Sequence, residues 1–115
     1  MKVGCPLSWR TFLGADATCA EFTIAAPDGV LDHRSLAQVA LPSETRGRER
    51  LGLILSGRGP IWLYAHLAHL AHPFAWVAVH DPRQGGAIVV ARHTPDAPAL
   101  GSVVPLPEAD VPSAP

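Results

Sequence analysis

The sequence has little of what marks a secreted, membrane-spanning or zinc-scaffold protein. Its two cysteines, Cys5 and Cys19, are too few for a disulfide framework or a four-ligand zinc site. No apolar run reaches the ~18 residues that a membrane-spanning helix needs, and no signal-peptide core follows Lys2. The formal net charge is only −1, so neither sign dominates. These absences predict a protein of the reducing cytoplasm without a membrane partner.

What the 115 residues do contain is typical of one small folded domain. Hydrophobic residues make up 48% and charged residues 17%, which is a globular rather than a disordered composition. Twelve prolines and ten glycines interrupt the chain often and predict short elements. Because residues 106–115 contain three prolines, we expect a domain over residues 1–105 and a disordered, proline-rich tail over 106–115.

The N-terminal third predicts a β-hairpin followed by a short helix. Ala17–Ile24 alternates apolar and polar residues as a strand does, and the turn residues Gly14–Asp16 precede it. A first strand over Trp9–Leu13 would complete the hairpin. Apolar residues within Leu31–Val39 fit one short helix, which Pro42 and its neighbours would end.

The second half predicts a compact βαβ unit. Leu51–Ser56 and Phe74–His80 are short apolar runs of the kind found in buried strands. Between them Ile61–Ala71 is rich in helix formers, with Pro60 suited to the first helical position. A third apolar run, Ala87–Arg92, follows. We therefore expect an α/β protein with two parallel strands, a right-handed crossover and a ligand site at the carboxyl ends of those strands.

Two loops rich in glycine and arginine come at those carboxyl ends. The first, Ser56–Gly59, leads into the helix, where glycine allows close approach and the helix N-terminus attracts anions. There Ser56 and the planar fork of Arg58 suit a phosphate. The spacing matches neither a dinucleotide fingerprint nor a Walker loop, and a tight strand-to-helix turn is the plainer interpretation.

The second loop, Asp81–Gly86, begins with an Asp-Pro-Arg sequence. Asp81 could hold a divalent cation or orient a base, and Arg83 could neutralise charge on a phosphate. The alternative is an Asp-Pro turn in which Asp81 bonds the backbone. His66, His69 and His72 repeat every three residues, so they could bind a metal or move protons, or could simply be hydrated. Only His72 stands at the end of the predicted helix.

Other noticeable residues have simpler explanations. Residues 94–115 hold three acidic and no basic residues, so residues 1–93 carry nine basic against seven acidic groups, an excess of +2. Four arginines lie close together in one stretch: Arg46, Arg48, Arg50 and Arg58. Such a cluster is typical of a solvated turn, and the alternative is a site for a small anion. We expect Trp62, Tyr64 and Trp76 in the core or an interface, and His80 facing solvent or a subunit interface.

Three segments together resemble the CRISPR-associated ring nuclease 3 family, small stand-alone accessory proteins of type III systems. They are the block Ser56–His72 with Gly-Pro-Ile-Trp inside it, the sequence Val77-Ala-Val-His-Asp-Pro-Arg83, and Gly86–Val90. The resemblance extends over Leu51–His93. It departs from the family pattern at His80, where an aromatic residue is more usual.

The resemblance implies both a fold and an activity. The fold would be a minimal Rossmann-like α/β domain, and the activity would be cleavage of the second messenger cyclic tetra-adenylate to linear adenylates with 2′,3′-cyclic phosphate ends. The cofactor would be Mn²⁺ or another divalent cation, and homodimers would form homotetramers around the ligand. This activity would switch off type III CRISPR signalling.

The resemblance also assigns roles to residues. The catalytic residues would be His72, Asp81 and Arg83, with His72 and Asp81 also the candidate metal ligands. The ligand-binding residues would be Ser56, Gly57, Arg58, Gly59 and Pro60. Two alternatives remain: a protein that only sequesters the messenger, and a Mn²⁺-dependent 3′ exoribonuclease on linear RNA. The excess of +2 is small for tracking a polyanionic strand.

Overall fold

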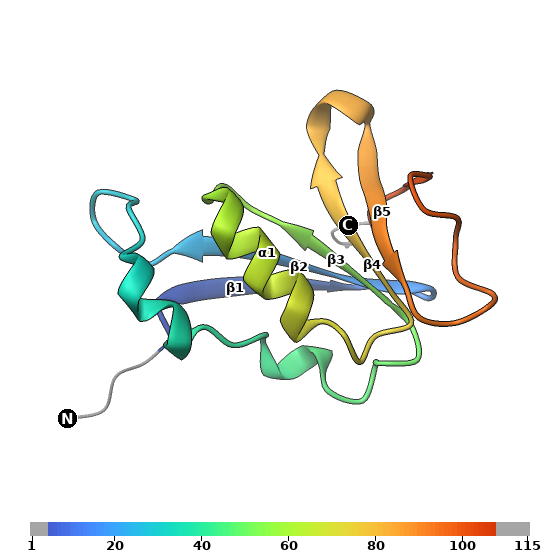
Figure 1. Ribbon diagram of the computed structural model, residues 1–115, viewed down its shortest axis with the longest axis horizontal. Coiled ribbons are helices and arrows are strands. Elements are labelled where there is room, and N and C mark those ends of the chain that lie inside the picture. Colours follow the sequence, from blue (N-terminus) through green and yellow to red (C-terminus); the bar gives the residue numbers. More distant parts are fainter. Residues whose placement is uncertain (1–4, 108–115) are drawn as a thin grey trace, which may run out of the picture.

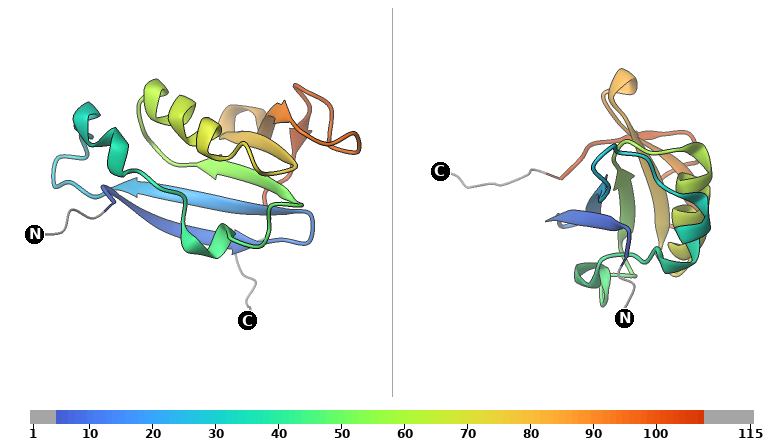
Figure 2. Two further views of the ribbon diagram at one scale, coloured as in Figure 1. Left: turned by 60° about the horizontal axis from the view of Figure 1, so that its bottom comes forward. Right: turned by 90° about the vertical axis from the view of Figure 1, so that its left-hand side faces the viewer.

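The computed structural model describes residues 5–107 and shows a six-stranded sheet with α1 and η1 packed on one face (Figures 1 and 2). The strands are β1 (Leu7–Leu13), β2 (Ala17–Ile24), β3 (Gly52–Ser56), β4 (Trp76–Asp81), β5 (Gly86–Arg92) and β6 (Val103–Val104). The helices are α1 (Ile61–Leu70) and the 3₁₀ helices η1 (His33–Gln38), η2 (Ser43–Thr45) and η3 (Pro82–Gln84). The mixed α/β class is confirmed.

The sheet has a parallel centre and antiparallel edges. Its order is β1-β2-β3-β4-β5-β6; β2, β3 and β4 run parallel, while the outer pairs run antiparallel. The predicted parallel pair around α1 is therefore confirmed, and β2 adds a third parallel strand. The order follows the chain without reversal, so the sheet lacks the switch point of a doubly wound Rossmann sheet. The Rossmann-like likeness stays a prediction.

One face of the sheet buries its side chains against α1. Leu53 and Leu55 of β3 project toward this face and pack with Leu63 and Leu67 of the helix, all of them fully buried. Figure 2 shows α1 and η1 on this same side. All five residues of β3 are buried, which explains why its sequence is an uninterrupted apolar run rather than an alternating one.

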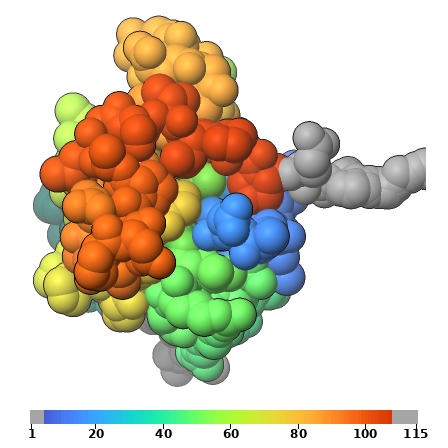
Figure 3. Space-filling model, turned by 90° about the vertical axis from the view of Figure 1, so that its right-hand side faces the viewer, coloured from blue at the N-terminus to red at the C-terminus, as the bar shows by residue number. Residues whose placement is uncertain are grey.

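The opposite face has a smaller core and no α-helix among residues 5–107. Ile54 and Ala78 pack there with Val89, and Leu106 lies against this cluster. Figure 3 shows the C-terminal segment, orange to red, reaching the β1–β2 turn. Leu106 and Pro107 also line a groove of about 280 Å³ beside that turn. Residues 108–115 of the predicted tail lie outside the described residues.

The N-terminal hairpin is confirmed, with a longer first strand and a different helix type after it. β1 begins at Leu7, two residues before the predicted start, because Leu7 pairs with Ile24 and is buried. The predicted helix is the 3₁₀ helix η1, which ends at Gln38, before Pro42. The α1 helix starts at Ile61, and extended Pro60 is its N-cap rather than its first residue.

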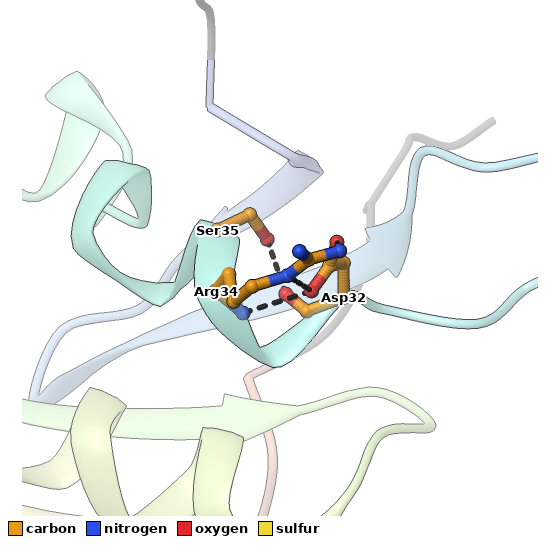
Figure 4. A network of polar contacts seen from close by, with 3 residues as sticks. All are labelled: Asp32, Arg34 and Ser35. Carbon is orange, nitrogen blue, oxygen red and sulfur yellow. Dashed lines mark hydrogen bonds and ion pairs between the residues drawn. The ribbon is translucent and has the colours of Figure 1, made fainter.

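A local polar network begins η1 (Figure 4). Asp32 accepts hydrogen bonds from the backbone N–H of Arg34 at 2.9 Å and from its guanidinium at 2.9 and 3.1 Å. These bonds from Arg34 lower the pKa of Asp32 to about 2. Ser35 donates to the Asp32 carbonyl. The helix start is therefore specified within four residues, although the site is exposed.

The β4–β5 hairpin extends past the neighbouring strands at the carboxyl end of the sheet (Figure 1). Its tip is η3, closed by Gly85 at a φ of 75°.

None of the helices within residues 5–107 is long and apolar enough to cross a membrane.

Candidate functional site

The carboxyl ends of the three parallel strands border one cavity of about 800 Å³. Since the strands are parallel and adjacent, their carboxyl ends meet at the same edge of the sheet. The cavity is lined by Arg10, Glu21, Phe22, Thr23, Ile24, Gly29, Ser56, Gly57, Arg58, His80 and Pro82. Both loops that the sequence singled out therefore reach the same cavity.

The Ser56–Gly59 loop has a conformation that only glycine accommodates. Gly57 has a φ of 135°, and a Cβ on it would lie 2.6 Å from the Phe22 carbonyl oxygen. A Cβ on Gly59 would lie 2.9 Å from the Phe22 ring. Tyr64 of α1 also supports the loop by donating a hydrogen bond to the Gly57 carbonyl. Burial raises the pKa of Tyr64 to about 12, so this donor keeps its proton at physiological pH.

The loop presents an arginine without an ion-pair partner among residues 5–107. Arg58 is exposed and makes no ion pair within residues 5–107. It lines the main cavity, and with Gly59 and Pro60 it lines a neighbouring one of about 410 Å³. Within the described part of the chain no side chain caps the N-terminus of α1, so the N–H groups of Ile61 and Trp62 are open to a ligand. The predicted binding residues thus lie together around an anion-attracting loop.

Ser56 is paired with His80, a residue to which the sequence assigned no role at the site. The Ser56 hydroxyl lies 3.1 Å from His80 Nδ1, and Ser56 is buried. His80 is half-exposed and lines the cavity beside Ser56, and its place at a subunit interface stays a prediction. Leu55 pairs with Val79 across β3 and β4, so the next residues become neighbours. Aligning the ends of the two predicted strands was the signal that could have found this pair.

Asp81 and Arg83 lie on the projecting hairpin beside the cavity. Asp81 Oδ1 accepts a hydrogen bond from the backbone N–H of Arg83 at 3.1 Å and lies 3.5 Å from its Nε. The Asp-Pro turn is therefore present, with Asp81 as its cap. The Arg83 side chain is 89% exposed, and that of Asp81 is 30% exposed. Both groups remain accessible to a ligand at this edge.

His72 lies at the other end of the same strand. It follows α1 and precedes β4, whereas Asp81 ends β4, so the length of the strand, roughly 17 Å, separates them. The His72 ring instead packs on His93, with 4.7 Å between ring centroids, and His93 Nδ1 bonds the Phe74 carbonyl. Within residues 5–107 no three His, Cys, Asp or Glu side chains form a metal-type group. A single chain does not bring the two candidate metal ligands together.

The remaining sequence candidates lie away from the cavity. Arg48 donates hydrogen bonds to the Thr18 hydroxyl and the Gly14 carbonyl near the amino ends of the strands. Arg46 and Arg50 are exposed in the same segment. Trp76 is buried and Tyr64 half-buried, while Trp62 is 38% exposed. The arginine stretch is thus not one patch, because Arg58 lies at the opposite end of β3 from the others.

Arg10 and Glu21 are cavity residues without any sequence signal. They face each other across β1 and β2, with 3.6 Å between the Arg10 Nη1 and a Glu21 carboxylate oxygen. Cys19 precedes Glu21 on the same strand face and is buried, and burial raises the pKa of its thiol to about 11. The thiol is therefore neutral and a poor nucleophile at physiological pH.

Comparison with known proteins places most of the chain, including both cavity loops, in one family. The family model described as CRISPR-associated protein (Cas_csx3) matches residues 24–105, which include both cavity loops. An uncharacterized protein of Aquifex aeolicus (strain VF5) is 57% identical over 44 residues. That alignment covers 38% of this chain and 40% of the relative, so it spans less than half of either protein.

Proposed function

Because the chain belongs to the Cas_csx3 family of CRISPR-associated proteins, we propose that it binds cyclic tetra-adenylate and cleaves it to linear adenylates. This is the activity that the likeness to ring nuclease 3 proteins implies. One observation carries the proposal: the glycine loop and its exposed Arg58 border a cavity of about 800 Å³ at the strand ends. A site of this kind suits a nucleotide ligand with exposed phosphates.

Binding would depend on the Ser56–Gly59 loop. A cyclic oligoadenylate is a ring of phosphodiesters, each carrying one negative charge. Arg58 supplies a bidentate cation, and the uncapped N-terminus of α1 supplies N–H donors and the positive end of the helix dipole. The rigid support from Phe22 and Tyr64 means that little loop ordering is needed on binding.

Cleavage would proceed by attack of a ribose 2′-hydroxyl on the adjacent phosphorus. The O2′–P bond forms, the P–O5′ bond breaks, and the products are a 2′,3′-cyclic phosphate and a 5′-hydroxyl end. Arg83 on the projecting hairpin would neutralise charge on the phosphate, and Asp81 would orient the Arg83 side chain. His72 would move protons between the two oxygens.

This division of roles needs more than one copy of the chain. His72 lies at the opposite end of the sheet from Ser56 and Arg58, so it can reach a bound ring only from another subunit. We propose a homodimer that binds the ring on a two-fold platform and a second dimer that closes over it as a homotetramer. The hairpin tip, which extends beyond β2 and β3, is suited to such a contact.

A divalent cation would not be held by one chain alone. No three-ligand group occurs in residues 5–107, and Asp81 Oδ1 already caps η3. The described side chains of one copy therefore form no metal site by themselves, and no catalytic step is assigned to a metal. Dependence on Mn²⁺ is a proposal that chelation tests directly.

Binding without cleavage is the second candidate. The observation that favours it is the distance of His72 from the cavity in a single chain. Such a protein would keep the contacts of Ser56 and Arg58 and would lower the free messenger concentration without consuming it.

Product analysis separates the two candidates. The protein is incubated with cyclic tetra-adenylate, with Mn²⁺ or with a chelator, and the products are separated by chromatography. Linear adenylates with 2′,3′-cyclic phosphate ends support the nuclease. Intact ring that co-elutes with the protein supports sequestration, and free intact ring contradicts both. Degradation of linear RNA from its 3′ end under the same conditions would indicate the exoribonuclease.

A further inference from the structure

A row of polar side chains crosses the open face of the sheet at the level of Ser56. Arg10 lies opposite Glu21, and Glu21 lies opposite Ser56 in the registers of the first three strands. The hydrogen bond between Ser56 and His80 extends the row to β4. Because side chains alternate between faces along a strand, all four lie on the face away from α1. The row borders the main cavity along its whole length.

Arg10 is held in place from two sides. Its guanidinium carbon lies over the Phe12 ring, 5.1 Å from the ring centroid, and Glu21 pairs with Nη1. Even so, 71% of the Arg10 side chain is exposed, so part of the guanidinium is open to a ligand. Planar guanidinium groups and aromatic rings are the surfaces on which nucleic-acid bases stack. Arg10 is therefore a preorganised planar group rather than a free surface charge.

Charge separates this row from the phosphate loop. Arg10 and Glu21 compensate each other, whereas Arg58 makes no ion pair within residues 5–107. An anionic phosphate is therefore drawn to Arg58, and the compensated pair favours a neutral, planar group. Arg10 also lines a second cavity of about 270 Å³, together with Phe12 and the apolar wall formed by Leu106 and Pro107. Apolar walls with polar groups at the edge suit the faces and edges of a base better than a ribose.

We propose that Arg10, supported by Phe12 and Glu21, is a stacking platform for a purine base whose phosphate binds at the Ser56–Gly59 loop. The proposal rests on the proposed function, because it states where an adenine of the adenylate ligand lies. Ser56 and His80 border the platform and supply hydrogen-bonding groups toward the edge of the base.

Arg10→Lys tests the platform, because lysine keeps the charge and loses the plane. The probes are cyclic tetra-adenylate with one adenine replaced by fluorescent 2-aminopurine, and inorganic sulfate, which has the charge without a base. We expect the wild-type protein to quench the fluorescence. Arg10→Lys should lose the quenching and bind roughly tenfold more weakly, as the loss of one stacked base does. Its sulfate affinity should stay unchanged.

Two further variants serve as comparisons. Phe12→Leu keeps apolar volume but removes the ring beneath Arg10, and should weaken binding in the same direction by a smaller factor. Leu13→Ala changes the next residue of β1, which is 59% exposed, and should leave affinity and quenching at wild-type values.

The outcomes separate this inference from the proposed function. Unchanged quenching and affinity in Arg10→Lys overturn the platform while ring binding stands. An equal loss of sulfate affinity makes Arg10 an anion contact through its guanidinium fork and also overturns the platform. If the wild-type protein does not bind the ring but quenches 2-aminopurine riboside 5′-monophosphate, and Arg10→Lys does not, the platform stands and the proposed function falls. If the wild-type protein binds neither the ring nor 2-aminopurine riboside 5′-monophosphate, the platform and the proposed function are both overturned.

Discussion

The two ends of the parallel strands carry similar residue types with different surroundings. At the amino ends, Arg48 is bonded to Thr18 and Gly14, and His93 is bonded to the Phe74 carbonyl. At the carboxyl ends, Arg58 makes no ion pair within residues 5–107, and His80 bonds a serine at the wall of a large cavity. At the amino ends Arg48 and His93 are therefore already bonded within the fold, although Arg46 and Arg50 in the same segment as Arg48 are exposed.

This difference follows from the backbone rather than from the residue types. A parallel strand that ends at a glycine loop before a helix leaves N–H groups and side chains directed at solvent. The amino ends receive the chain from loops that pack back onto the sheet, as the bonds from Ala75 to Glu49 and Leu51 show. An arginine or histidine is therefore available to bind a ligand where its side chain is not already hydrogen-bonded to the local backbone.

The largest effects are expected from glycines at the two ends of β3. A Cβ on Gly52 would lie 2.1 Å from the Trp76 indole, and one on Gly57 would lie 2.6 Å from the Phe22 carbonyl oxygen. Each change to alanine should lower the free energy of unfolding by about 3 kcal/mol, measured by urea denaturation. Only Gly57→Ala should also weaken ring binding under conditions in which both variants are folded. Equal affinities would show that the two ends do not differ.

Next in size is the loss of the exposed Arg58 guanidinium at the carboxyl end. Arg58→Ala should weaken binding of cyclic tetra-adenylate by about 1.5–3 kcal/mol, because a charge-assisted hydrogen bond is lost. Arg46→Ala removes the same charge from an exposed position at the amino end and should leave the affinity unchanged. Isothermal titration of both variants measures the difference. An equal effect of the two changes would reduce Arg58 to a contribution to net charge.

A smaller effect concerns the histidine at the amino end. His72→Ala should slow turnover about tenfold or slightly more, which corresponds to about 1.4 kcal/mol, with binding near normal, and Asp81→Ala should do the same. Mixing His72→Ala with Arg58→Ala should restore part of the activity, because one copy binds the ring while another supplies His72. Full turnover by His72→Ala at saturating Mn²⁺ would remove this residue from the site. Failure of the mixture, with both variants folded, would contradict the shared site.

The smallest effect is expected outside both ends, at η1. Because the hydrogen bonds from Arg34 lower the pKa of Asp32 to about 2, its contribution to stability is complete above the ordinary value of 3.8. That contribution is lost as the pH falls through about 2. Asp32→Asn should therefore flatten part of the decline in Tm between pH 4 and about 2, and should leave ligand binding unchanged. Parallel Tm curves for both proteins would show that the pair contributes nothing.

The elements were predictable where the signal was local. The hairpin, the strand β3 and the helix α1 are each specified by a few residues: apolar spacing inside them, glycine or proline at their ends. The two-residue strand β6 was missed because Val103–Val104 has no periodicity and is a strand only through pairing with β5. The 3₁₀ form of η1 was missed because apolar spacing over so few residues does not distinguish helix types.

The site was predictable in part for the same reason. The Ser56–Gly59 loop is recognisable from its own glycines and the helix that follows it. The Ser56–His80 contact depends on the register of two strands 24 residues apart, and the Arg10–Glu21 pair on a hairpin register. Sequence proximity was misleading for His72 and Asp81, because a strand between two residues separates them by its whole length.

By itself the sequence determined which segments are strands, helix and loops, since apolar periodicity, glycine and proline act over a few residues. It also determined that parallel strands surround α1, because a helical crossover joins them. Only the tertiary structure decided which polar groups meet at one edge: Arg10, Ser56, Arg58 and His80 come from three strands and a loop. Their meeting depends on strand register and strand direction. Both follow from packing the whole sheet against α1 and the C-terminal segment, which no local pattern encodes.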